Sequence, residues 1–421
     1  MDFIYFFSGL IILMIIQVMP PIKDKILIQI LVAVPLINAI ADVTTNYFTD
    51  GYFTIGAFRA FLLLILFILL SGNIRFKGTS FFIYLFLFYL LFLIPLSSNS
   101  FHSFNEYLKI AISLFMFPLG YYLLSKEILI KRLNTFLLLG VSVIIAQGII
   151  SQLFKLGISE YLEDSLYLGG GLVQITYTLV LFVITSPIVL SLIQSKRKKI
   201  IYMLFVFMSI LMTLLVLRRI SIVSIIIGYF IYLFLSVHKF KVLKFGFLSL
   251  VVVGITYPIY GELFEARLEA RQESLPELSK ESRILETFFV LKEINENSTF
   301  ETLFGTDVFS SQTTFKKDRQ YFYILGRGRQ LHVDYNILLH GTGIIGLILY
   351  IFIYLNLFYK GMHFRKVTSL FHKEMVAVFW SIFTVTLILS FSGSITSIGF
   401  RSGAFLYMGS ILGYLKESDD E

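Results

Sequence analysis

The sequence lacks cysteine altogether, and its 421 residues include only one tryptophan, eight prolines and 15% charged residues. The absence of cysteine excludes disulfides and thiolate metal sites. A soluble chain would carry roughly a quarter charged residues, so the low charge favours a chain that lies largely in lipid. The net charge of +8 does not predict nucleic-acid binding, because most Lys and Arg fall in short loops between apolar blocks.

Apolar blocks fill most of the sequence, and 57% of the residues are hydrophobic. The blocks run for about 18 to 23 residues, the length that crosses a hydrocarbon core of about 30 Å. Lipid offers the backbone no hydrogen-bond partner, so such blocks must be helices. The first block has no basic flank and no small-residue cleavage site, which favours a retained helix over a signal peptide. The sequence predicts an all-α, polytopic integral membrane protein with about 13 (12–14) transmembrane helices. The expected spans are 3–19, 26–41, 52–72, 80–97, 107–125, 135–154, 172–194, 199–217, 220–237, 243–260, 336–358, 374–391 and 395–415.

Basic residues alternate between the loops. Every second loop is rich in Lys and Arg, as at 196–199, whereas the loops between them carry acids such as Asp42 and Glu106. Because basic loops stay in the cytoplasm, the N-terminus is expected outside and the C-terminus inside. Three parts follow: a membrane domain over 1–260 with about ten helices, a large outer loop over 261–333, and about three further membrane helices over 334–421.

The outer face is expected to be rich in cations. Arginine forks bind phosphate oxygens in pairs and never deprotonate, and histidine titrates in the range of a general base. Such a cluster suits a lipid-linked pyrophosphate. Each residue also has a structural interpretation, as a solvated turn, a surface ion pair, a lipid-phosphate contact or the anchor of a span. The candidates are Arg218, Arg219, Arg267, Arg271, Arg283, Arg327, Arg329 and His332.

Signatures of soluble enzymes are missing from the sequence, including the P-loop, G-x-G-x-x-G, H-E-x-x-H and G-x-S-x-G. The outer face also has no D-x-D pair of the kind that holds a metal ion against a nucleotide sugar. ATP and nucleotide sugars are cytoplasmic, so chemistry on the outer face must use a substrate that is already activated.

Three segments together resemble a known family. The segment "GRQLHVDYNILLHGTGIIGLILY" resembles the signature of the bacterial O-antigen polymerase (Wzy-type) and O-antigen ligase superfamily, in which a His precedes a "GIIG"-like turn. Upstream, "SRILETFFVLKEI…TLFGTD" resembles the loop segment of that family, with an amphipathic helix that lies on the membrane or caps a cavity. The segment "LVLRRISIVSIIIGYF" is similar to its short arginine hairpin. The resemblance covers roughly the last half of the chain.

The resemblance implies a metal-independent membrane glycosyltransferase of the GT-C type without a cofactor. Its donor would be an undecaprenyl-pyrophosphate-linked oligosaccharide on the outer side of a bacterial plasma (inner) membrane. Arg219 and Arg283 would neutralise the departing pyrophosphate, and His332 would be the general base. Many relatives have Asn directly after this His, whereas this chain has Val333 and then Asp334, so Asp334 is expected to orient His332 or to bind the acceptor sugar. The remaining candidates for substrate binding are Arg218, Arg267, Arg271, Arg327 and Arg329.

The leading hypothesis is a polymerase that joins lipid-linked repeat units into O-antigen, capsule or exopolysaccharide. The alternative is a ligase that moves the finished glycan onto lipid A core or protein. Besides the lipid-linked glycan and membrane lipids, the resemblance implies a chain-length regulator as a partner, and nucleic acid is not expected. A transporter or flippase would need ionisable residues deep in its spans. Arg59 and Arg401 are the clear intramembrane charges, and both are expected to be paired or to lie near an interface.

Overall fold

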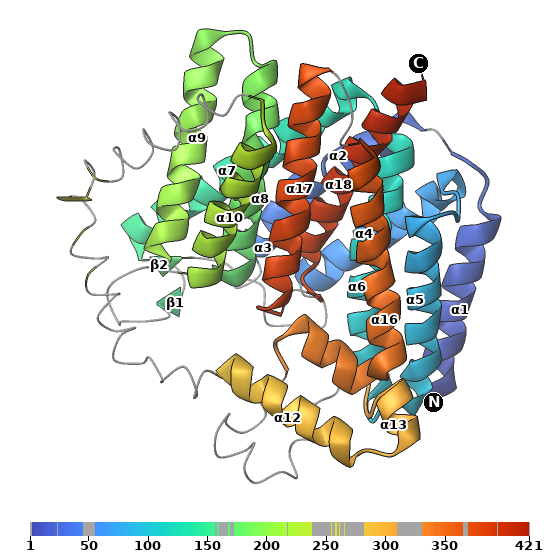
Figure 1. Cartoon of the computed structure of the whole chain (residues 1–421). Helices are drawn as coiled ribbons and strands as arrows, with labels where there is room; N and C mark the ends of the chain where they lie inside the picture. The colour runs from blue at the N-terminus through green and yellow to red at the C-terminus, as the bar shows by residue number, and fades with distance from the viewer. Residues whose placement is uncertain are drawn as a thin grey trace.

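A computed structural model describes most of the chain, and the regular structure in the described ranges is helical apart from one very short hairpin (Figure 1). The hairpin pairs β1 (Ile158–Ser159) antiparallel with β2 (Tyr167–Leu168). The described residues are 2–22, 24–44, 55–155, 158–159, 167–168, 172–216, 218–237, 254, 257–258, 261, 265, 282–309, 331–364, 369–393 and 395–420.

The helices form a bundle, with two further helices across one end of it (Figure 1). The two end helices are α12 (Ser282–Glu296) and α13 (Thr299–Phe304). The bundle contains α1 (Asp2–Val18), α2 (Lys25–Val32), α3 (Val34–Thr44), α4 (Ile55–Leu70), α5 (Thr79–Leu93), α6 (Ser100–Leu123), α7 (Glu127–Phe154), α8 (Leu172–Leu192), α9 (Lys196–Leu215), α10 (Arg219–Leu235), α16 (Asp334–His363), α17 (Leu370–Ser390) and α18 (Ile398–Asp420).

The chain is a multi-pass helical membrane protein, but the expected count of about 13 spans is too high. Among the described residues, seven helices are long and apolar enough to cross a membrane, and the bent pair α2–α3 brings the number to eight. The helices α1 and α10 fall short in length or apolar extent, and α2 and α3 meet at 51°. The helices α6 and α18 are long but more polar. The block expected over 243–260 lies largely outside the described residues.

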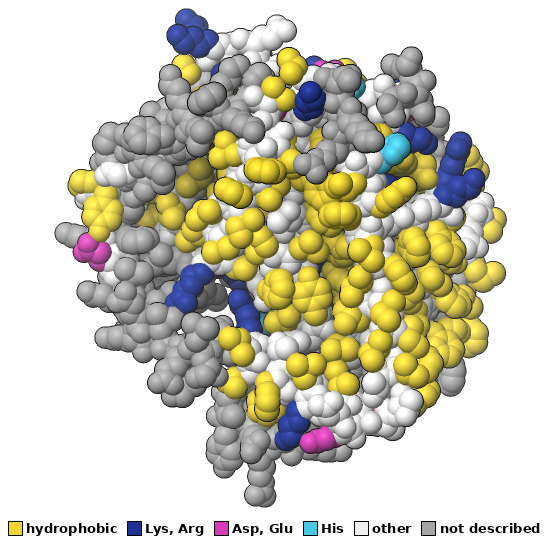
Figure 2. Space-filling model, in the orientation of Figure 1, with side chains coloured by type: hydrophobic (Ala, Val, Ile, Leu, Met, Phe, Trp, Pro, Cys, Tyr) yellow, Lys and Arg dark blue, Asp and Glu magenta, His cyan; other side chains and the backbone are white. Residues whose placement is uncertain are grey.

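The surface fits a lipid environment. Apolar side chains spread over the middle of the face drawn in Figure 2, whereas most described Lys and Arg side chains lie nearer its two ends. On α16 the exposed side chains include Ile348, Phe352 and Leu355, which recur at helical spacing. Large exposed apolar areas of this kind are stable only against lipid or a partner.

The centre of the bundle is the pair α6 and α18, which share the largest interface among the described helices. Glycines allow the two backbones to approach closely. A Cβ at Gly409 would lie 2.1 Å from the carbonyl oxygen of Phe117, and one at Gly413 would lie 2.3 Å from that of Tyr121. Small residues at this spacing are typical of helix pairs in membranes, where dispersion contacts replace the hydrophobic effect.

The expected pairing of the two intramembrane arginines is confirmed. Arg59 on α4 forms an ion pair with Asp42 on α3, and Arg401 on α18 forms one with Asp334 on α16. All four side chains are buried. A charge in a low-dielectric interior is stable only with a partner and further hydrogen bonds, so both pairs tie helices together.

The part of the long loop over 282–309 docks onto the start of α16. The Thr306 N–H donates to the His340 carbonyl at 2.8 Å, and Asp307 accepts hydrogen bonds from the turn before α6 at Ser97 and Ser98. Gly305 has a φ of +88° and sits directly against the Gly341 backbone. The docking therefore depends on backbone-to-backbone contact that no side chain separates.

Replacing Gly305 with alanine is expected to destabilise this docking. The new Cβ would lie 2.4 Å from the Gly341 carbonyl carbon, in a backbone conformation that only glycine adopts without strain of about 1–3 kcal/mol. The thermal midpoint in detergent should fall, and protease cleavage within 298–309 should speed up. The matched control is Gly254→Ala, where a Cβ meets nothing within 4 Å and stability should hold. Equal midpoints for the two variants would contradict the docking.

Candidate functional site

A cavity of about 180 Å³ lies where the docked loop segment meets the bundle. Three of the six histidines of the chain line it, together with one carboxylate. The cavity is bounded by α6, by the start of α16 and by the turn between α17 and α18. The polar side chains and the glycine of its lining are His102, Glu106, His332, His340, Thr396 and Gly393.

The main chain at His332 is held by a buried carboxylate on α12. One oxygen of Glu286 accepts the backbone N–H groups of His332 and Val333 at 2.7 and 2.9 Å. Its other oxygen lies 4.0 Å from Nδ1 of His332. The Glu286 side chain is 0% exposed, whereas the His332 side chain is 50% exposed. The imidazole can therefore meet a substrate while its backbone stays fixed.

A second histidine–carboxylate pair lies about two turns further along, between α12 and α16. Nδ1 of His340 is 2.8 Å from Oε2 of Glu293, and the His340 side chain is 1% exposed. Glu293 is two turns of α12 beyond Glu286, so both carboxylates lie on the helix face that meets α16. A carboxylate on one imidazole nitrogen fixes the tautomer and leaves the other nitrogen to act.

The turn between α17 and α18 closes the cavity beside His332. Gly393 has a φ of +78°, and a Cβ there would lie 1.8 Å from the His332 carbonyl oxygen. The Ile395 N–H donates to Asp334 at 2.8 Å. The position at 393 therefore requires glycine, and the turn is attached directly to the backbone that carries the histidine.

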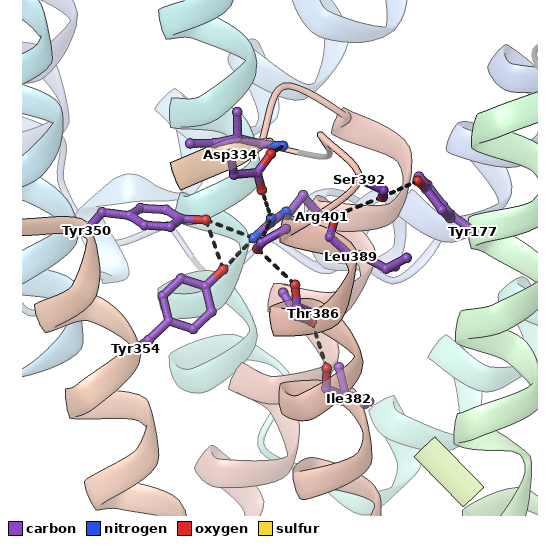
Figure 3. A network of polar contacts seen from close by, with 11 residues as sticks. Tyr177, Asp334, Tyr350, Tyr354, Ile382, Thr386, Leu389, Ser392 and Arg401 are labelled. Atoms are coloured by element: carbon purple, nitrogen blue, oxygen red, sulfur yellow. Dashed lines mark hydrogen bonds and ion pairs between the residues drawn. The ribbon is translucent and has the colours of Figure 1, made fainter. Parts of the chain in front are cut away.

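Asp334 lies inside the bundle, in the polar network of Figure 3. Its side chain is 0% exposed, and it binds Arg401 as well as the Ile395 N–H. Arg401 also donates to Tyr350 at 3.0 Å and to Ser390 at 2.8 Å. The expected contact of Asp334 with substrate or with the imidazole of His332 does not fit this burial, because the carboxylate is directed toward Arg401. The structure gives Asp334 a structural role.

The arginine hairpin lies near the same turn, and its inward-facing member is Arg218. The Arg218 guanidinium is 5.2 Å from the centre of the Tyr177 ring, and the Tyr177 hydroxyl is 2.6 Å from that of Ser392, next to Gly393 (Figure 3). Arg219 is exposed. In Figure 2, basic side chains border a hollow at the place where Figure 1 shows the lower end of α10. The resemblance favoured Arg219, whereas the contacts connect Arg218 to the cavity rim.

Arg283 is the second residue of α12 and is partly exposed. It precedes Glu286 by three positions, and residues at this spacing are neighbours on a helix, with about 5–6 Å between Cβ atoms. The structure therefore brings Arg283 to the same end of the bundle as His332, outside the residues that line the cavity. Four further predicted residues lie outside the described ranges: Arg267, Arg271, Arg327 and Arg329.

Several residues of the site were not predicted from the sequence. Glu286, Glu293 and His340 sit within the resembling segments, but their pairing spans the loop between α12 and α16. The cavity wall on α6, with His102 and Glu106, comes from a distant part of the chain. The sequence did contain a signal for His102. Histidine is scarce in this chain, and the alternation of basic loops places His102 and His332 on the same side of the membrane.

No cluster of three His, Asp or Glu side chains suited to a metal ion occurs within the described residues. In comparisons with known proteins, no family model and no curated protein matches the chain.

Proposed function

We propose that this protein is a membrane glycosyltransferase of the GT-C type that polymerises undecaprenyl-pyrophosphate-linked repeat units on the outer face of a bacterial plasma membrane. The observation that carries the proposal is the docking of 282–309 onto the start of α16. Two segments that resemble the same family meet there around one cavity lined by a half-exposed histidine.

The proposed reaction uses a general base on the acceptor hydroxyl and cations at the departing pyrophosphate. His332 takes the proton from an acceptor hydroxyl, whose oxygen attacks the anomeric carbon of the donor sugar. The bond from that carbon to the pyrophosphate oxygen breaks, and the electron pair leaves with the lipid pyrophosphate. Arg283 and the 218–219 hairpin are positioned at this end of the bundle to stabilise the departing charge.

The membrane orientation belongs to the proposal as well. The cavity, α12 and the 218–219 hairpin would face outward, and the Lys-rich start of α9 would face the cytoplasm, as the alternation of basic loops indicates. An outward-facing site has no access to nucleotide sugars. A lipid-linked pyrophosphate supplies the activated donor on that side.

The test is transfer by the purified protein in lipid nanodiscs. The substrate is lipid-linked glycan isolated from source cells in which the gene for this chain is deleted. A ladder of longer glycans, formed with EDTA present, is the expected result. Folded protein that leaves this substrate unchanged would overturn the proposal.

The deletion strain separates a polymerase from a ligase. Cells without a polymerase still attach a single repeat unit to the final acceptor, whereas cells without a ligase attach none. We expect the single unit. Complete loss of attached glycan, with lipid-linked chains of full length accumulating, would assign the ligase function instead.

A further inference from the structure

The cavity beside His332 has a lining that differs in charge from the predicted arginine cluster. Its polar side chains are a carboxylate, three imidazoles and a threonine hydroxyl, and no Lys or Arg is among the described lining residues. A carboxylate repels a pyrophosphate, whereas hydrogen-bond acceptors and imidazoles suit hydroxyl groups. The chemistry of the cavity therefore fits a neutral sugar rather than the phosphate end of the donor.

One face of α6 forms part of the cavity wall. His102 and Glu106 are four residues apart on this helix, which places them side by side. Asn99 caps the helix by accepting the His102 N–H at 3.1 Å, so the start of this wall is fixed. Glu106 is 9% exposed and forms an ion pair with Lys109 at 2.5 Å. The carboxylate is thus largely shielded from water.

Shielding makes this carboxylate a strong hydrogen-bond acceptor. A hydrogen bond to a charged group contributes more than one between neutral groups, and little water competes at a carboxylate that is only 9% exposed. Two oxygens can accept from two neighbouring hydroxyls of one pyranose ring. The cavity is smaller than the roughly 300–1,000 Å³ of typical pockets for small molecules, which suits one sugar rather than a whole oligosaccharide.

We infer that Glu106 and His102 form the binding subsite for the acceptor sugar, and that they present its hydroxyl to His332 in the same cavity. This inference rests on the proposed function and deepens it, because it separates the two substrates. The acceptor sugar binds in the cavity between α6 and α16. The pyrophosphate of the donor binds outside it, on the side of Arg283 and the 218–219 hairpin.

The test uses an acceptor that cannot act as a donor. Mild acid releases the glycan from its lipid pyrophosphate, and a fluorescent label on the reducing end removes any leaving group. Binding of this labelled glycan is measured by fluorescence anisotropy without donor, and transfer onto it is measured with lipid-linked glycan as donor. The binding measurement does not depend on turnover.

Glu106→Gln is the informative variant, because it keeps the shape of the side chain and removes its charge. We expect binding of the labelled acceptor to weaken by about tenfold to hundredfold, and the KM for this acceptor to rise by the same factor. The KM for the lipid-linked donor should stay unchanged. His102→Asn should weaken acceptor binding in the same direction.

Lys109→Met is the matched control. It breaks the ion pair of Glu106 but leaves the carboxylate on the cavity wall, so acceptor binding should stay within about threefold of the parent. Equal losses in Glu106→Gln and Lys109→Met would mean that only the ion pair matters, and would overturn the subsite. An unchanged acceptor KM in Glu106→Gln, or a raised donor KM, would also overturn it. Failure of the parent to make any ladder would instead count against the proposed function.

Discussion

Replacing His332 with alanine is expected to lower the rate of glycan transfer by about 10²- to 10⁴-fold, the usual contribution of a positioned general base. A sugar hydroxyl is a poor nucleophile until its proton is removed as it attacks. The His332 side chain is 50% exposed at the cavity and can reach such a hydroxyl. The loss should fall on kcat, because the base acts in the transition state. Transfer is measured as the initial rate of ladder formation in nanodiscs.

The variant is expected to fold normally, which makes a rate loss interpretable. Glu286 holds this part of the chain through the backbone N–H groups of His332 and Val333, and alanine keeps both donors. Gly393 packs against the carbonyl oxygen of residue 332, which also remains. The thermal midpoint of His332→Ala should therefore stay close to that of the parent.

The two histidines of α16 provide the controls. His363 is exposed at the opposite end of the helix, and His363→Ala should transfer at the parental rate. His340 is the rival base, because its Nδ1 lies closer to a carboxylate than that of His332 does. Its side chain is 1% exposed, so we expect His340→Asn to retain more activity than His332→Ala. The reverse order, with His332→Ala within a few-fold of the parent, would assign the base to His340.

The helices of this fold could be predicted well from the sequence, but their number as membrane spans could not. Apolar blocks predict where helices form, because lipid forces the backbone to bond internally. They do not show whether a helix faces lipid or other helices. The sequences of α6 and α18 predicted membrane spans, but both helices are largely buried in the bundle. Because they face other helices, they can carry the charged residues Glu106 and Arg401. The block 26–41 was expected as one span, but its helix bends at Ala33, two residues before Pro35, which lacks the N–H that a continuous helix needs.

The sequence indicated which segment carries the candidate site, but it indicated few of the contacts between the residues of that site. His332 could be identified because it sits in a segment of recognisable spacing. Its carboxylate neighbour Glu286 could not, because an amphipathic helix with several Glu residues gives no sign of which one turns inward. Asp334 was expected to orient His332 or to bind the acceptor sugar because it follows His332 by two positions. On a helix start, side chains two positions apart point in different directions, and Asp334 points into the bundle.

Replacing Asp334 with alanine is expected to destabilise the protein by about 3–5 kcal/mol, the usual cost of leaving a buried charge without its partner. Arg401 is 2% exposed and would keep its hydrogen bonds to Tyr350 and Ser390 but lose its counter-charge. The Ile395 N–H would lose its acceptor at the same time, which loosens the turn at the cavity. Thermal unfolding in detergent should show the loss, and transfer should fall with it.

The double variant Asp334→Ala/Arg401→Leu tests whether the charge is the cause. Removing both partners leaves no buried ion, so most of the lost stability should return. Activity should return less than stability does, because the Ile395 N–H still lacks an acceptor and the turn that carries Gly393 is still untethered. A double variant no more stable than Asp334→Ala would show that Asp334 acts on the turn alone. Full stability in Asp334→Ala itself would show that the ion pair does not stabilise this fold. A buried arginine tolerates the loss of its carboxylate only where water or lipid phosphate takes the place of that carboxylate.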